Sequence, residues 1–83
     1  MTEVQRWEYH SVHLVATGLL RDKGWRLWQI NEQEQQDWKK SAIYASVNEF
    51  CNQMGQQGWE LVDVAYPGET VTFAILHFKR SLQ

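Results

Sequence analysis

A single helical stripe of apolar residues near the middle of the chain constrains the fold more than any other feature of this sequence. Five residues recur at the 3.6-residue period of an amphipathic helix: Ile43, Val47, Phe50, Cys51 and Met54. The pattern begins near Ser41, and Gly58 follows where helices commonly end with a glycine. The spacing therefore predicts one helix with one apolar side, which another element of the fold must cover.

The segments on either side of this helix have the composition of β-strands. Aromatic and β-branched residues predominate in four of them: 6–15, 25–30, 59–66 and 70–80. Gly24 and the pair Pro67–Gly68 suit turns between consecutive strands, because glycine tolerates positive φ and proline fixes φ. The order β-β-α-β-β predicts an α+β fold: a small antiparallel sheet of three to four strands with the amphipathic helix packed on one face.

We expect one small domain over residues 1–83, because no linker, repeat or change of composition divides the chain. Residues 17–40 form a Trp-rich excursion between the first strand and the helix. Within it, residues 31–40 are polar and fit two interpretations: a loop, or a helical lead-in capped by Asn31 with Glu34 three residues on.

The composition excludes several classes of protein. No apolar run approaches the ~20 residues that cross a bilayer, and the first residues do not have the pattern of a signal peptide. The single cysteine, Cys51, cannot form an internal disulfide, which favours a cytoplasmic protein. A net charge of −2 argues against a dedicated binder of duplex DNA.

Three short motifs resemble a known family. They are Trp7-Glu8-Tyr9 near the start, Gln57-Gly58-Trp59-Glu60-Leu61-Val62 after the helix, and Phe78-Lys79-Arg80 near the end. Together they resemble the small prokaryotic and phage proteins catalogued as domain of unknown function 4177, over roughly residues 5–16 and 43–81. The resemblance implies the small α+β fold and a possible phage origin. It implies no activity and no catalytic residues.

The sequence contains no recognisable catalytic or metal-binding motif. Cys51 lies on the apolar stripe, where a thiol usually packs in the core. His10 and His13 should point to opposite faces of their strand, and so should Glu60 and Asp63 of theirs. We therefore predict no catalytic residues, no metal site and no cofactor, and we expect a protein that is not an enzyme.

Aromatic and basic residues alternate at the start of the excursion. Trp25 and Trp28 interleave with three cations, Arg21, Lys23 and Arg26. Such a set can stack a base while holding a phosphate, although tryptophans of a small domain more often cover its core. Residues three apart on a strand face opposite sides, so only one of the two tryptophans can enter the core of its own subunit.

These observations predict a non-enzymatic binding module that binds or sequesters a small anionic aromatic ligand, such as a nucleotide. The predicted ligand-binding residues are Trp25, Trp28, Arg26, Arg21 and Lys23. Both faces of the last strand are apolar, so we also expect a homodimer or higher homo-oligomer. Three alternatives stay open. The same aromatics could grip a protein partner, as in an adaptor, or could form a dimer arm. The third alternative is a small enzyme with a His/Glu site between subunits.

Overall fold

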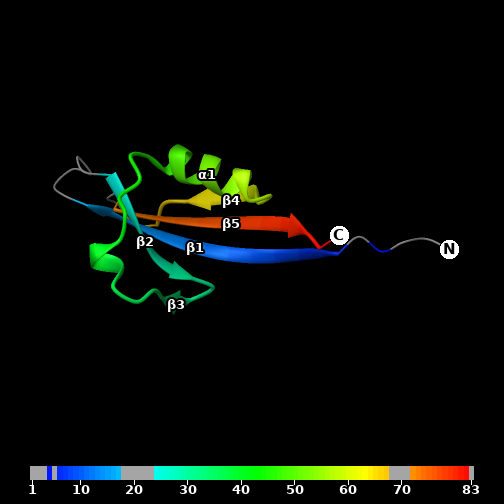
Figure 1. Ribbon diagram of the computed structural model, residues 1–83, viewed down its shortest axis with the longest axis horizontal. Helices are drawn as coiled ribbons and strands as arrows, with labels where there is room; N and C mark the ends of the chain where they lie inside the picture. The colour runs from blue at the N-terminus through cyan, green and yellow to red at the C-terminus, as the bar shows by residue number, and fades with distance from the viewer. Residues whose placement is uncertain (1–3, 5, 18–23, 68–71, 83) are drawn as a thin grey trace.

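The computed structural model describes residues 4, 6–17, 24–67 and 72–82, which form one antiparallel sheet with one α-helix against it (Figure 1). The elements in chain order are β1 (Trp7–Thr17), β2 (Gly24–Ile30), β3 (Gln33–Glu34), the 3₁₀-helix η2 (Trp38–Lys40), α1 (Val47–Gln56), β4 (Glu60–Ala65) and β5 (Phe73–Ser81). Neighbouring strands pair in the order β3-β2-β1-β5-β4. The predicted α+β class and the four main strands are therefore confirmed.

The strand count and order differ from the prediction at residues 31–40. This segment forms neither a plain loop nor a helical lead-in: it turns back, adds the two-residue strand β3 to the edge of the sheet, and then enters η2. Asn31 has a φ of 52° and Glu32 one of 69°, which make the tight turn. The Asn31 side chain does not cap a helix, because its Oδ1 accepts a hydrogen bond from the Ser11 amide at 2.9 Å.

The helix begins later than its apolar stripe predicts. Tyr44 pairs with Trp25 through two backbone hydrogen bonds of 2.8 Å, which hold the chain extended just before α1. Ser46 is the N-cap, and its hydroxyl accepts from the Glu49 amide at 3.0 Å. The Glu49 carboxylate accepts in turn from the amide of Ala45. This reciprocal capping fixes the start of the helix at Val47.

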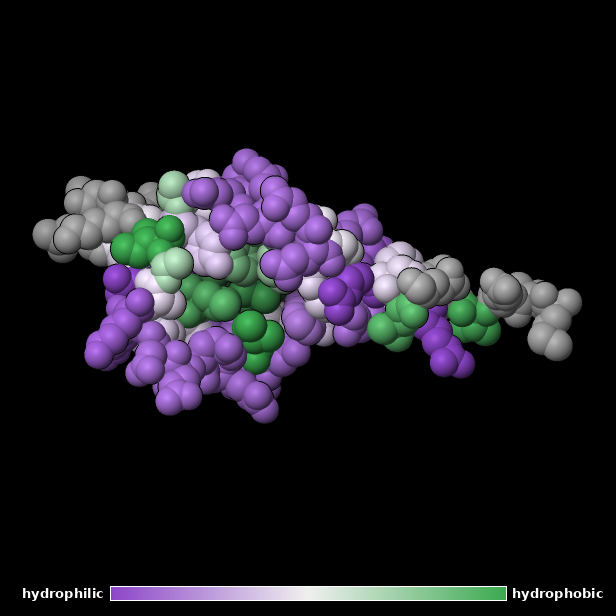
Figure 2. Space-filling model, viewed as in Figure 1, coloured by the Kyte–Doolittle hydropathy of each residue, from purple (hydrophilic) through white to green (hydrophobic). Residues whose placement is uncertain are grey.

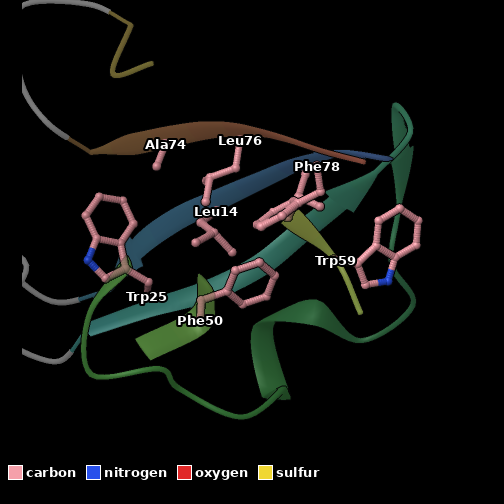
Figure 3. Packing of buried hydrophobic residues seen from close by; sticks show 8 residues of the cluster. Leu14, Trp25, Phe50, Trp59, Ala74, Leu76 and Phe78 are labelled. Carbon is pink, nitrogen blue, oxygen red and sulfur yellow. The ribbon is translucent and has the colours of Figure 1, made fainter. Parts of the chain in front are cut away.

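The hydrophobic core lies between α1 and one face of the sheet (Figure 3). Its buried residues come from the helix and four strands or strand entries: Val12, Leu14, Trp25, Phe50, Trp59, Ala74, Leu76 and Phe78. Trp25 and Trp59 lie at opposite ends of this row, with the smaller side chains between them. The two indoles therefore close the ends of a core that only one helix covers.

Alternation along the two central strands creates a second face, which we call the open face. It carries Trp7, Tyr9, Ser11, His13 and Val15 of β1, paired with Ser81, Lys79, His77, Ile75 and Phe73 of β5. None of these residues is buried, whereas the alternate residues Val12, Leu14, Leu76 and Phe78 are. The prediction that α1 covers one face only is thus confirmed.

Polar side chains cover α1 and the segment after β2, and apolar residues gather between them in the view of Figure 2. The helix α1 is too short and too polar to cross a membrane, as are all helical segments within the described residues. The predicted turn at Pro67–Gly68 lies partly outside the described residues. Gly24, at the start of β2, and Gly58, after α1, have φ values of +99° and +90°, a region that favours glycine.

Two extra residues shift the alternation of the outer strands. In β2, Gln29 pairs with His13 and Leu27 with Leu14, which leaves Trp28 as the extra residue. In β4, Leu61 pairs with Phe78 and Asp63 with His77, which leaves Val62 unpaired. Such bulges re-aim the side chains beside them.

Candidate ligand-binding site

Four aromatic rings meet on the open face at the β2 end of the sheet. The Trp28 ring lies at the centre, with ring-centroid distances of 5.7 Å to Phe73, 6.1 Å to Trp38 and 6.2 Å to His13. We call these four residues the Trp28 cluster. Their separations are typical of tilted aromatic contacts, and Phe73 is 39% exposed. The cluster therefore offers ring surface to a planar molecule.

One hydrogen bond orients the central ring. Trp28 Nε1 donates to Glu34 Oε1 at 2.8 Å, which joins the indole to β3. The turn at Asn31 and Glu32 brings β3 back along β2, so the local fold of residues 31–34 places this acceptor. The Trp28 ring is therefore held by a polar contact at its edge and by aromatic contacts at its sides.

Positive charge adjoins the cluster. Arg26 is paired with Val15 in the ladder, and its Nη1 donates to the backbone carbonyl of Lys39 in η2. The Nε of Arg26 is buried and has no hydrogen-bond partner among the described residues. The ammonium of Lys39 lies 5.7 Å from the centroid of the Trp38 ring, within the range of a cation–π contact. Arg26 is thus held against η2, beside Lys39.

A shallow hollow of about 480 Å³ adjoins the cluster and is lined by residues 34–40. Trp38 belongs both to this hollow and to the Trp28 cluster. The charged residues that line the hollow are Glu34, Asp37, Lys39 and Lys40. A volume in this range is typical of sites for small molecules.

The structure separates the five predicted ligand-binding residues. Trp28 and Arg26 lie together at the cluster, as expected for one site. Trp25 is only 6% exposed and packs in the core, because it lies on the opposite face of β2 from Trp28. A core indole offers a ligand little ring surface, so we do not include Trp25 in the candidate site. Arg21 and Lys23 lie outside the described residues.

Sequence reasoning missed part of the site. The alternation of aromatic and basic residues over 21–28 does not point to Lys39, Lys40, His13 or Phe73, which lie elsewhere in the sequence. Their proximity depends on the reversal at 31–34 and on strand pairing between β1 and β5. The one local signal is the sequence Trp38-Lys39-Lys40, in which a tryptophan is followed directly by a cation, as it is at Trp25-Arg26.

Apart from the Trp28 cluster, the middle of the open face carries a row of polar residues: Ser11, His77 and Asp63. His77 Nδ1 lies 2.8 Å from Asp63 Oδ1, and Ser11 is the cross-strand partner of His77 on the other side. The bulge at Val62 puts Asp63 on the same face as Glu60, so the prediction that these carboxylates face opposite sides is wrong. Among the described residues no hydrogen bond joins Ser11 Oγ to His77, so nucleophile and base are not connected. Both His77 and Asp63 have more than half of their side chains exposed, which leaves them in water.

At one end of the sheet face that α1 covers, four side chains contact one another. The Cζ atom of Arg80 lies 4.3 Å from the centroid of the Trp59 ring, and the His10 ring lies 4.1 Å from it. Arg80 also donates to Glu8 through Nε at 2.8 Å and through Nη2. These contacts join β1, β5 and the entry to β4, which is a structural role.

The opposite orientation of His10 and His13 and the packing of Cys51 agree with the prediction from sequence. His10 and His13 contact Trp59 and Trp28 on opposite faces. Cys51 packs against the core, and burial raises the pKa of its thiol above the ordinary value of 9.0. Across the described part of the chain, no three His, Cys, Asp or Glu side chains group as metal ligands.

Comparison with family models, with curated proteins and with solved structures gave no match to this chain. The resemblance to domain of unknown function 4177 therefore stays a prediction from the three motifs.

Proposed function

We propose that the protein is a non-enzymatic binding module that holds a small anionic aromatic ligand, such as a nucleotide, at the Trp28 cluster. The observation that carries this proposal is the contact of four aromatic rings beside Arg26 on the face that α1 leaves open. A nucleotide combines a flat ring with negative charge. Rings and cations on one surface match both properties.

The two halves of such a ligand have separate places on this surface. The base would stack on Trp28 or Trp38, whose rings are 6.1 Å apart. The phosphate would lie toward Arg26, Lys39 and Lys40, which form no ion pair with a carboxylate within the described residues. The hollow lined by residues 34–40, which include Trp38, Lys39 and Lys40, adds about 480 Å³ of space beside the cluster. Binding alone would suffice for a protein that sequesters its ligand.

We also propose a cytoplasmic homo-oligomer. Cys51 is a free thiol, which suits a reducing compartment. The edge strand β4 is exposed along its whole length and carries three large apolar residues: Leu61, Val62 and Val64. Exposed edges and apolar patches of this kind commonly pair with another chain. Light scattering at micromolar concentration should give at least twice the monomer mass of 9.9 kDa, and a monomer would contradict this part of the proposal.

Calorimetric titration with a panel of nucleotides tests the ligand proposal. At least one nucleotide should bind the wild-type protein, and Trp28→Ala or Arg26→Ala should weaken its binding by about 5- to 100-fold, as expected for loss of one stacking or charge contact. Trp7→Ala is the matched control, because Trp7 also lies on the open face beside a lysine but outside the cluster. No heat from any nucleotide would contradict the proposal.

The same substitutions separate this function from the alternative of a dimer arm or protein adaptor. Residues 31–40 project from β2 at one edge of the sheet, which is also where a partner could pack (Figure 1). In the ligand proposal, Trp28→Ala and Arg26→Ala leave the mass of the oligomer unchanged. A smaller oligomer in either variant would favour the dimer arm.

A further inference from the structure

A second aromatic residue with a cation above its ring lies on the open face, far from the Trp28 cluster. The Nζ atom of Lys79 is 4.4 Å from the centroid of the Trp7 ring. Tyr9 is the cross-strand partner of Lys79 and is 64% exposed. These three residues, which we call the Trp7 group, repeat the combination of ring and cation found at Trp38 and Lys39.

The Trp7 group and the Trp28 cluster are joined by one strand. Trp7, Tyr9 and His13 all face the open side of β1, and the His13 ring contacts Trp28. His13 lies six positions after Trp7, which at a rise of ~3.3 Å per residue is about 20 Å. In Figure 1, β1 runs from the end of the molecule near the C-terminus toward the opposite end, where Thr17 pairs with Gly24 at the start of β2. One nucleotide cannot reach both groups, whereas about six stacked nucleotides at ~3.4 Å each can.

The charges of this face favour a polyanion along β1 rather than across the sheet. Cations lie at both ends of the path, with Lys79 at one end and Arg26 and Lys39 at the other. Lys79 forms no ion pair within the described part of the chain, although Glu60 is its neighbour on β4. The carboxylates of Glu60 and Asp63 come from β4, so they border the path on one side.

We infer that the open face binds a single-stranded oligonucleotide, with bases stacked on Trp7, Tyr9 and the Trp28 cluster and phosphates near the lysines and Arg26. This inference rests on the proposed function, because it extends the same nucleotide site along β1. Stacking on successive aromatic residues, with cations beside the backbone, is how proteins commonly hold single strands without reading their sequence.

Fluorescence anisotropy with thymidine monophosphate competing against labelled hexathymidylate and dodecathymidylate tests the inference. The hexamer should bind the wild-type protein at least about tenfold more tightly than the mononucleotide, and its affinity should fall as salt rises. Trp7→Ala and Lys79→Gln should each remove most of this gain and leave the affinity for the mononucleotide unchanged. Tyr66→Ala is the control: Tyr66 is an exposed aromatic that contacts Trp25 rather than the open face, so its loss should change neither affinity.

Different failures have different meanings. A mononucleotide that binds as tightly as the hexamer, or a hexamer affinity unchanged in both Trp7→Ala and Lys79→Gln, would overturn the inference and leave the proposed function standing. If neither the mononucleotide nor the hexamer binds, and no nucleotide of the calorimetric panel gives heat, both the inference and the proposed function would be overturned. A smaller oligomer in Trp7→Ala would identify a second copy of the chain as the occupant of this face. That result would overturn the inference that an oligonucleotide binds there.

Discussion

The guanidinium of Arg80 stacks on the indole of Trp59, with the Arg80 Cζ atom 4.3 Å from the ring centroid. The same guanidinium donates two hydrogen bonds to Glu8, so one arginine on β5 links the first strand to the junction between α1 and β4. Trp59 is buried at one end of the core (Figure 3), and its amide donates to the Met54 carbonyl in the last turn of α1. Trp59 at the junction between α1 and β4 therefore has a structural role.

Trp59→Ala should lower the free energy of unfolding by about 3–5 kcal/mol, because a large buried side chain is lost and a cavity is left. Chemical denaturation monitored by circular dichroism gives the value. Trp7→Ala is the matched control. Its ring is partly exposed and mainly meets Lys79, so a loss of no more than about 1 kcal/mol is expected. Equal losses in the two variants would contradict the role assigned to Trp59.

Gly58→Val should cost about 1–3 kcal/mol, because Gly58 has a φ of +90° that a β-branched residue adopts only with strain. Space is not the cause, since a Cβ atom at this position would lie 3.5 Å from the Arg80 side chain, an ordinary contact. Gly55→Ala in the helix is the control and should stabilise by about 0.5–1 kcal/mol, because nothing obstructs its methyl group. The two variants should therefore shift the unfolding midpoint in opposite directions.

Gly24→Ala should be more damaging than a change of backbone preference alone. A Cβ atom at Gly24 would lie 2.4 Å from the carbonyl oxygen of Tyr44, in addition to the φ of +99°. The chain before α1 would have to move, and the paired hydrogen bonds between Trp25 and Tyr44 would open. We expect a loss of at least about 2 kcal/mol and faster amide exchange at these two residues. If the Trp25 and Tyr44 amides of Gly24→Ala exchange as slowly as in the wild type, the fold does not depend on the close approach of Gly24 to Tyr44.

Cys51 should resist alkylation in the folded protein. Burial raises the pKa of its thiol above 9.0, so at pH 7 the thiol is protonated and unreactive. Unfolding exposes the group and lowers its pKa, so this group stabilises the fold below pH 9 and loses that contribution as pH rises through its folded pKa. Iodoacetamide should label Cys51 much faster in denaturant than in buffer. Equal rates would mean that the helix does not pack as described.

Local patterns in the sequence predict the four main strands, the single helix and the free side of the sheet. They fail where the chain departs from simple alternation. The bulge at Val62 moves Asp63 to the open face beside His77, and nothing in the residues 60–65 signals that extra residue. The helix begins late because Tyr44 pairs with Trp25, a contact between segments nineteen positions apart in the sequence.

The candidate site is likewise predictable from the sequence only in part. Trp28 and Arg26 are predictable, since aromatic and basic residues alternate in the sequence itself. The partners Trp38, Lys39 and Phe73 come from η2 and β5, and only the reversal at Asn31 and the pairing of β1 with β5 bring them together. Trp25 and Trp28 look equivalent in the sequence, yet strand alternation places one in the core and the other on the open face.

The indole N–H signals of the five tryptophans, followed by two-dimensional NMR during titration with the nucleotide that binds best, test the central claim most directly. The signals of Trp28 and Trp38 should shift together and saturate, while those of the core residues Trp25 and Trp59 stay in place. Trp28→Ala should abolish the shift of Trp38. Shifts confined to other tryptophans, or no shift in any of the five, would contradict a ligand site at the Trp28 cluster.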